Sequence, residues 1–159
     1  MQIKIFVESF YIVLLGVMLG STLTLGAFVA PVVFKAALYM DNEAIGVFDS
    51  GRLMSEIFRR YSICVSAALV FSVAYEIWRF WIGDRRLAVA LIATIVLISG
   101  GLFAWYYVPA IYDLQTQGVD ATLSADFGTL HSQSVTLFKI FAAANCVLLA
   151  YRVSRLFRG

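Results

Sequence analysis

A lysine and a histidine lie within a stretch of sequence that is otherwise apolar enough to cross a membrane. Lys139 is near the middle of the run from Phe127 to Tyr151, and His131 is near its start. A charged side chain at the centre of a bilayer costs several kcal/mol unless it is paired or hydrated, so such residues commonly mark functional sites. We therefore predict an outward-facing polar chamber, with His131 in its wall and Lys139 at its floor, that binds or passes a small solute or a metal ion.

Other polar residues are expected either on the same helix face as His131 or, in the other helices, at a similar depth. Ser134 and Asn145 fall on the same stripe of that helix, at about 100° per residue. The three other helices would contribute further residues to the chamber, namely Pro31, Lys35, Arg59, Arg60, Tyr61, Tyr106 and Tyr107. The simpler alternative is an interfacial belt of tyrosine and arginine, with His131 as a hydrogen-bonded packing residue.

The sequence carries no motif of an enzyme and none that indicates a cofactor. One histidine and two cysteines are too few for a histidine-rich zinc site or for bis-histidine haem ligation within one chain. Cys64 and Cys146 are expected at depths that differ by about 20 Å, which excludes a disulfide between them. We predict that both are small, buried apolar residues and that the protein is not an enzyme.

Four apolar runs position these residues. They extend from Phe6 to Phe34, from Tyr61 to Ile82, from Leu87 to Ile111 and from Phe127 to Tyr151. Each provides about the 20 residues that an α-helix needs to cross a hydrocarbon core. Apolar residues make up 62% of the chain and charged residues only 14%, so lipid must cover part of the apolar surface. The predicted fold is an all-α integral membrane protein, with residues 1–159 forming a single antiparallel bundle of four transmembrane helices.

Basic residues predict the orientation of this bundle. With four crossings, one side of the membrane receives Lys4, Arg79, Arg85, Arg86, Arg152, Arg155 and Arg158. Lysine and arginine favour the cytoplasmic side. We predict that both termini are cytoplasmic, that the loops after Phe34 and Ile111 face outside, and that the protein lies in a bacterial inner membrane.

Charged residues also predict local structure at both ends of the bundle. The spacing of Asp49, Arg52, Glu56 and Arg60 predicts an amphipathic helical extension over about residues 50–60, which Ser50 would cap. Near the cytoplasmic ends of the first two helices, Glu8 and Glu76 are expected to pair locally with Lys4 and Arg79.

Small residues and prolines predict how the helices pack and end. Gly16 and Gly20 have the spacing at which helices approach closely in lipid, and we predict that they pack within the bundle, with pairing between two copies as the alternative. Pro31 and Pro109 lie near helix ends. They are expected either to terminate these helices or to free a carbonyl beside the outer chamber.

Two short segments carry a resemblance to a known family. They are the segment from Gly26 to Phe34 and the segment from Leu130 to Ser134. The chain resembles the transmembrane protein 205-like family of small four-helix membrane proteins of unknown function, through Pro31, Phe34, His131, Ser134 and Asn145. The eukaryotic relative is associated with resistance to a platinum drug, so the resemblance implies handling of metals or xenobiotics. A similar layout occurs in four-helix copper-resistance and protoporphyrinogen-oxidising proteins, which use further histidines.

The leading prediction is a membrane protein that binds or passes a small solute or metal ion. The alternative is a non-catalytic accessory or scaffold subunit of a membrane complex, and a weaker alternative is a haem-linked membrane oxidoreductase. The expected partners are the lipid bilayer and either further copies of the chain or another membrane protein. A net charge of +2 does not favour nucleic acid.

Overall fold

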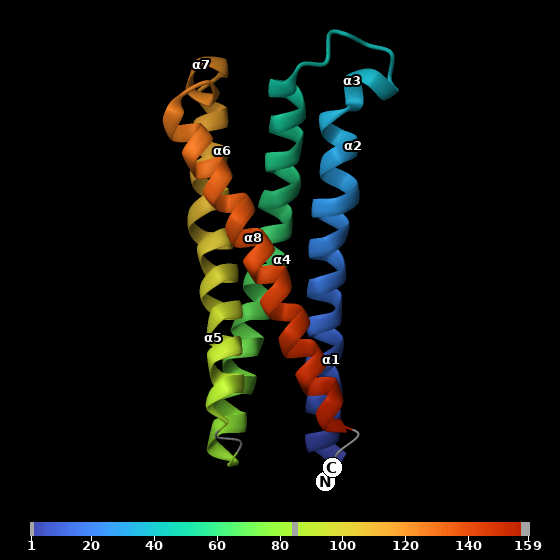
Figure 1. Cartoon of the computed structure of the whole chain (residues 1–159), viewed down its shortest axis with the longest axis vertical. Coiled ribbons are helices and arrows are strands. Elements are labelled where there is room, and N and C mark those ends of the chain that lie inside the picture. Colours follow the sequence, from blue (N-terminus) through green and yellow to red (C-terminus); the bar gives the residue numbers. More distant parts are fainter. Residues whose placement is uncertain (1, 84–85, 157–159) are drawn as a thin grey trace.

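The computed structural model describes residues 2–83 and 86–156 of the chain. These residues form helices and contain no strand, and four of the helical stretches are long and apolar enough to cross a membrane (Figure 1). The predicted fold class, an all-α membrane protein with four spanning helices, is therefore confirmed.

Two of the four spanning stretches are composite. The first consists of α1 (Gln2–Leu23), the π-helical η1 (Thr24–Val29) and α2 (Ala30–Phe34). The third consists of α5 (Leu87–Leu102), the π-helical η2 (Phe103–Tyr107) and α6 (Val108–Thr116). The second and fourth stretches are the single helices α4 (Val47–Trp81) and α8 (Ala125–Leu156). The short helices α3 (Ala36–Tyr39) and α7 (Val119–Thr122) lie in the connections.

Both prolines follow π-helical turns, and neither ends its helix. The Ala30 N–H donates to the Leu25 carbonyl just before Pro31, and the Val108 N–H donates to the Phe103 carbonyl just before Pro109. The wider turn keeps the backbone hydrogen-bonded where a proline ring would clash with the carbonyl one α-helical turn earlier. Termination at the prolines, one of the two predictions for them, is therefore wrong, because the helices continue to Phe34 and Thr116.

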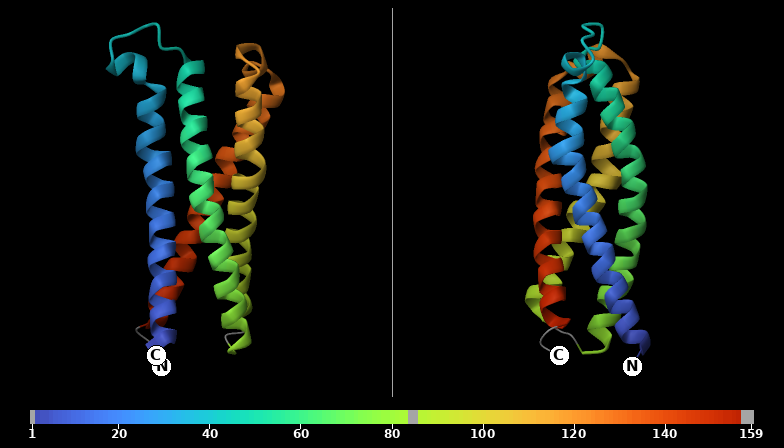
Figure 2. Two further views of the ribbon diagram at one scale, coloured as in Figure 1. Left: turned by 180° about the vertical axis from the view of Figure 1, so that it is seen from behind. Right: turned by 90° about the vertical axis from the view of Figure 1, so that its right-hand side faces the viewer.

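The helices are joined mainly through α4 and α8. The start of α1 and the end of α8 lie at one end of the bundle, here called the terminal end, and α3 and α7 lie at the opposite, distal end (Figures 1 and 2). The helix α8 runs obliquely from α6 at the distal end, across α5, to α1 at the terminal end. The helix α4 packs on α5 and α6 and also on α1 and α2. The first and third spans are thus held together by the second and fourth.

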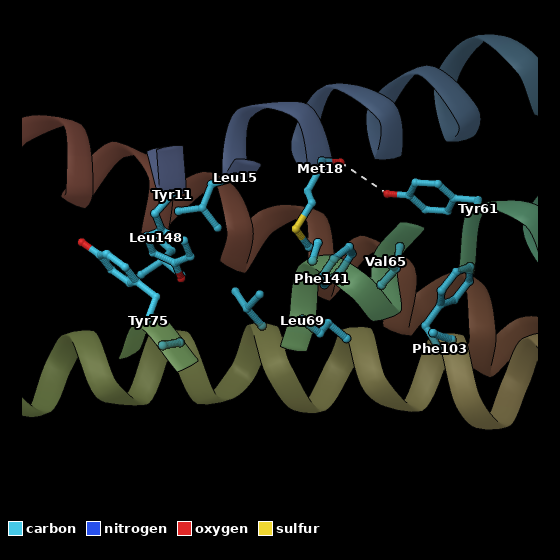
Figure 3. Packing of buried hydrophobic residues seen from close by; sticks show 14 of the residues in the cluster. Tyr11, Leu15, Met18, Tyr61, Val65, Leu69, Tyr75, Phe103, Phe141 and Leu148 are labelled. Carbon is cyan, nitrogen blue, oxygen red and sulfur yellow. Dashed lines mark hydrogen bonds between the residues drawn. The ribbon is translucent and has the colours of Figure 1, made fainter. Parts of the chain in front are cut away.

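Apolar side chains fill the centre of the bundle. Leu15, Leu69 and Phe141, from three different helices, are at most 1% exposed (Figure 3). Toward the distal end, the Tyr61 hydroxyl lies 2.6 Å from the Thr22 hydroxyl and donates to the Met18 carbonyl at 3.3 Å. A packed apolar layer therefore separates the polar groups at the two ends.

Glycine allows the closest helix contact at this level. A Cβ atom at Gly100 would lie 2.7 Å from Cε2 of Phe141 and 3.1 Å from Cδ2 of Leu69. At Gly16 and Gly20, by contrast, an added Cβ atom would meet nothing within 4 Å. The prediction that these two glycines pack against another helix of the bundle is therefore wrong, and their pairing between copies stays a prediction.

We expect the distal end to face outside. In a cysteine-free variant, single cysteines at Asn42, Asp84 and Gln117 should be tested with a membrane-impermeant thiol reagent on intact cells. Asn42 and Gln117 should react and Asp84 should not, because the basic residues gather at the terminal end. Asp84 and Arg85 lie outside the described residues. Labelling after permeabilisation is the control for all three sites, and reaction at Asp84 in intact cells would reverse the orientation.

Candidate functional site

Neither of the two cavities described below is lined by the residues of the predicted chamber. His131, Lys139, Pro31, Arg59 and Tyr106 are exposed, Tyr107 is half-buried, and Ser134 and Asn145 are buried. The His131 ring stacks on Phe127 of the same helix, with 6.1 Å between the ring centroids. Other residues line the two cavities described below.

The rotation of α8 about its own axis explains why Lys139 is exposed. The side of α8 that packs into the bundle carries Ser134, Phe141, Asn145 and Leu148. Lys139 lies on the opposite side, as does Cys146, which is exposed. Cys64 of α4 is exposed as well, so the prediction that both cysteines are buried is wrong. In a membrane, these outer faces lie toward lipid or toward another protein.

A polar groove is present at the distal end, between α4 and α6. It has a volume of about 420 Å³ and is lined by Asp49, Arg52, Leu53, Glu56, Tyr112, Gln115 and Thr116. The helix α4 has 35 residues, which makes it about 50 Å long, whereas a hydrocarbon core is about 30 Å thick. Its first turns, with the groove, therefore extend beyond the apolar core.

Local sequence explains the start of α4. The Gly46 N–H donates to the Asp49 carboxylate at 3.0 Å, which closes the first turn. The helix therefore begins at Val47, and the predicted capping residue, Ser50, lies within it and is buried. This early start adds Asp49 to the helix surface that forms the groove.

The groove contains charges of both signs. Glu56 accepts from Arg59 at 2.7 Å and from Arg60 at 2.8 Å, and the second of these pairs has the predicted spacing. The Arg59 guanidinium also lies 5.9 Å from the centroid of the Tyr112 ring. Arg52 contacts the Phe48 ring and has no salt bridge within the described ranges. Arg52 is therefore the cation of the groove that can pair with a ligand.

Gln115 places an amide in the groove wall. Only 7% of the residue is exposed. Its Nε2 atom lies against α4 where Gly51 leaves room, since a Cβ atom there would be 2.7 Å away. Its Oε1 atom is buried and has no hydrogen-bond partner among the residues that the structure describes. A buried acceptor without a partner costs about 1–3 kcal/mol, so a donor from a bound solute or a water molecule would be stabilising.

A second polar cluster links three helices in the half of the bundle nearer the terminal end. Glu8 of α1 pairs with Arg79 of α4 at 3.1 Å. Glu76 of α4 accepts from Arg152 of α8 and from the Tyr11 hydroxyl, the latter at 2.9 Å. We call these five residues the terminal network.

The terminal network combines compensated charges with aromatic packing. The Arg152 side chain is only 2% exposed, and its guanidinium lies 5.2 Å from the centroid of the Tyr75 ring. Tyr75 in turn stacks on Tyr11 at 3.8 Å. Glu76 also borders a cavity of about 260 Å³ between α4 and α5, most of whose other lining residues are apolar. Because each carboxylate is paired with a guanidinium group of another helix, the terminal network holds α1, α4 and α8 together.

Sequence reasoning missed the partners in the terminal network. It predicted local pairs for Glu8 and Glu76, whereas both carboxylates bind arginines of other helices. The sequence does indicate that Arg152 points into the bundle, because it lies seven residues after Asn145 and therefore on the same face of the helix. The groove gave a weaker signal, because a glutamine in a polar segment does not indicate burial.

Comparison with known proteins identifies a family but no activity. A family model described as a domain of unknown function (DUF4149) matches residues 13–120. No curated protein and no solved structure matches the chain. The matched segment includes every residue that lines the groove, whereas α8 lies beyond it. The comparisons do not confirm the resemblance to the transmembrane protein 205-like family.

Proposed function

Since the chain belongs to the DUF4149 family, whose function is unknown, we propose a function from its own geometry. It is an integral membrane protein that binds a small polar solute in the groove between α4 and α6. The observation that carries this proposal is Gln115, a buried amide whose Oε1 atom has no partner within the described part of the chain. Because most buried polar side-chain atoms in native proteins have a hydrogen-bond partner, this acceptor favours a bound molecule with a donor group.

The lining of the groove favours a solute with both a positive and a negative group. The Arg52 guanidinium can pair with a carboxylate, and Asp49 can accept from an ammonium group. The volume of about 420 Å³ falls within the range of about 300–1,000 Å³ that is typical of small-molecule sites. A zwitterion of the size of an amino acid fits these requirements.

Two observations favour binding of an organic solute over passage of a metal ion. In residues 2–83 and 86–156, no group of three or more His, Cys, Asp or Glu side chains lies close enough to hold a metal ion. The packed layer around Leu69 and Phe141 separates the groove from the terminal network. In this conformation, the groove is therefore a binding site at one end of the bundle.

The proposal predicts that a zwitterion stabilises the purified protein and that Arg52 is required. Melting temperatures should be measured in mild detergent with alanine, glutamate, putrescine or glucose. A ligand at about ten times its Kd adds about 1.4 kcal/mol of stability, which raises the melting temperature by about 3–6 °C. We expect such a shift with alanine, and we expect Arg52→Gln and Gln115→Leu to abolish it.

Lys35→Gln is the matched control for this experiment. It removes one positive charge from an exposed residue near the same end of the bundle but outside the groove. The variant should respond to alanine as the wild type does. If none of the four solutes shifts the wild type, or if Arg52→Gln and the wild type respond equally, the groove is not the binding site.

The accessory-subunit function remains as a second candidate because α8 exposes a lysine near mid-depth. Co-purification of one stoichiometric membrane protein, with no response to solutes, would favour it. A Soret absorption band in the purified protein would favour the haem-linked alternative instead.

A further inference from the structure

The exposed face of α8 carries an inference that is independent of the groove. We propose that this face binds a transmembrane helix of another protein and that the partner helix carries a carboxyl group near mid-membrane, which pairs with Lys139. Three features support the proposal: the depth of Lys139, the absence of a partner for it within the described chain, and the residues that surround it.

Contacts of Phe141 establish the depth of Lys139. Phe141 packs against Gly100 and Leu69, which lie near the middle of the third and second spans. Lys139 precedes Phe141 by two residues, so its Cα atom is displaced by about 3 Å along the helix axis. The oblique course of α8 shortens this displacement along the membrane normal (Figure 1). The Cα atom of Lys139 therefore lies close to the bilayer centre.

From this depth, the ammonium group cannot reach water by extending along the helix. A lysine side chain spans about 6 Å, whereas half of a hydrocarbon core measures about 15 Å. The group therefore ends several ångströms inside the apolar region even when it points toward the distal end. A charge there is costly unless it is paired or the bilayer deforms.

The described chain offers no partner to Lys139. The residue is exposed, and none of the salt bridges or side-chain hydrogen bonds between described residues includes it. The two carboxylates of the terminal network, Glu8 and Glu76, are engaged with arginines. A compensating group must therefore come from another molecule.

Lys139 lies within a straight line of small residues on the exposed surface of α8. Exposed residues at alternating spacings of four and three run along the whole helix, and we call them the α8 stripe: Ala125, Thr129, Ser132, Thr136, Lys139, Ala143, Cys146 and Ala150. Apart from the lysine, all are small, whereas Val135, Ile140 and Val147 beside the stripe are bulky and exposed. This spacing is the one at which two helices pack at a small crossing angle. Small side chains let the helix backbones approach closely in lipid.

Charge complementarity selects the occupant of the α8 stripe. In a symmetric dimer of this chain, the same surface patch would meet itself, which would place Lys139 of one copy near Lys139 of the other. Two ammonium groups in a low-dielectric region repel strongly. A partner helix with a glutamate or aspartate at the same depth replaces that repulsion with an ion pair or a charge-assisted hydrogen bond.

The proposal can be tested with designed helices in vesicles. The full chain, labelled at Asn42→Cys in a Cys64→Ala, Cys146→Ala background, is reconstituted in phosphatidylcholine. Labelled apolar leucine–alanine helices with a central Glu, Gln or Leu are added, and association is measured by energy transfer. We expect the Glu helix to bind about tenfold more tightly than the Leu helix, the ratio for one interhelical hydrogen bond in lipid. Lys139→Leu should remove this preference.

Matched variants separate the stripe from the rest of the surface. Ala143→Leu should weaken binding of the Glu helix, because the larger side chain would keep the partner helix away from the α8 stripe. Val147→Leu, beside the stripe, should not weaken it. All these side chains are exposed, so the variants should keep the wild-type melting temperature. Equal binding of the three helices to the wild type would overturn the proposal. So would efficient formation of a disulfide-linked dimer through native Cys146 in a Cys64→Ala protein, since a second copy would then occupy the stripe.

Discussion

Replacement of Arg152 by methionine is expected to lower the free energy of unfolding by about 3–5 kcal/mol, because it leaves the largely buried carboxylate of Glu76 without its cationic partner. The variant should be compared with the wild type by denaturant titration in mild detergent. The Tyr11 hydroxyl would still donate to Glu76, but one neutral hydrogen bond cannot balance a buried charge.

Two further variants show whether the loss comes from the ion pair. The double variant Glu76→Leu/Arg152→Met leaves no buried charge without a partner, so most of the free energy of unfolding should be regained. A loss of about 1 kcal/mol should remain, because Tyr11 loses its hydrogen bond. Arg155→Met removes a half-buried arginine about one turn further along α8 and should have a much smaller effect. If Arg152→Met is as stable as the wild type, the terminal network does not lock the three helices.

Substitution of Gly100 is expected to have the second large effect. In Gly100→Ala, the new methyl group would lie 2.7 Å from Phe141 and 3.1 Å from Leu69. The Phe141 and Leu69 side chains or the third span itself would have to shift, at a cost of about 1–3 kcal/mol. Gly100→Leu should prevent closure of the bundle and reduce the yield of monodisperse protein. Melting temperature and size-exclusion profile are the measurements.

Gly16→Ala is the matched control, since its Cβ atom would meet nothing within 4 Å. It should melt at or slightly above the wild-type temperature, because alanine favours the helix over glycine. Gly100→Ala combined with Phe141→Leu should regain part of the loss, since the smaller side chain makes room for the methyl group. Equal stability of Gly100→Ala and the wild type would show that the helices do not meet closely at this glycine.

The arginines of α4 and α8 show the limit of sequence reasoning about this site. Glu56 and Arg60 are four residues apart on one helix, and the ion pair that this spacing favours is present at 2.8 Å. Glu76 and Arg152 are far apart in the sequence, and spacing alone gives no reason to pair them. Their contact depends on the oblique course of α8, which brings its last turns against α1 and α4.

The apolar length of four segments was sufficient to predict the four spanning helices and the all-α fold, because helix formation and transfer into lipid depend on local composition. The tertiary structure alone decided which face of each helix points inward. In a soluble protein, the apolar face of a helix marks the core, whereas in lipid apolar residues cover both the packed and the exposed faces. The residue types of Lys139, Cys146 and Gly16 favour the interior, because lipid is a costly surrounding for a charge and small residues allow close helix contact. The packing of the helices nevertheless leaves Lys139 and Cys146 exposed and Gly16 half-buried.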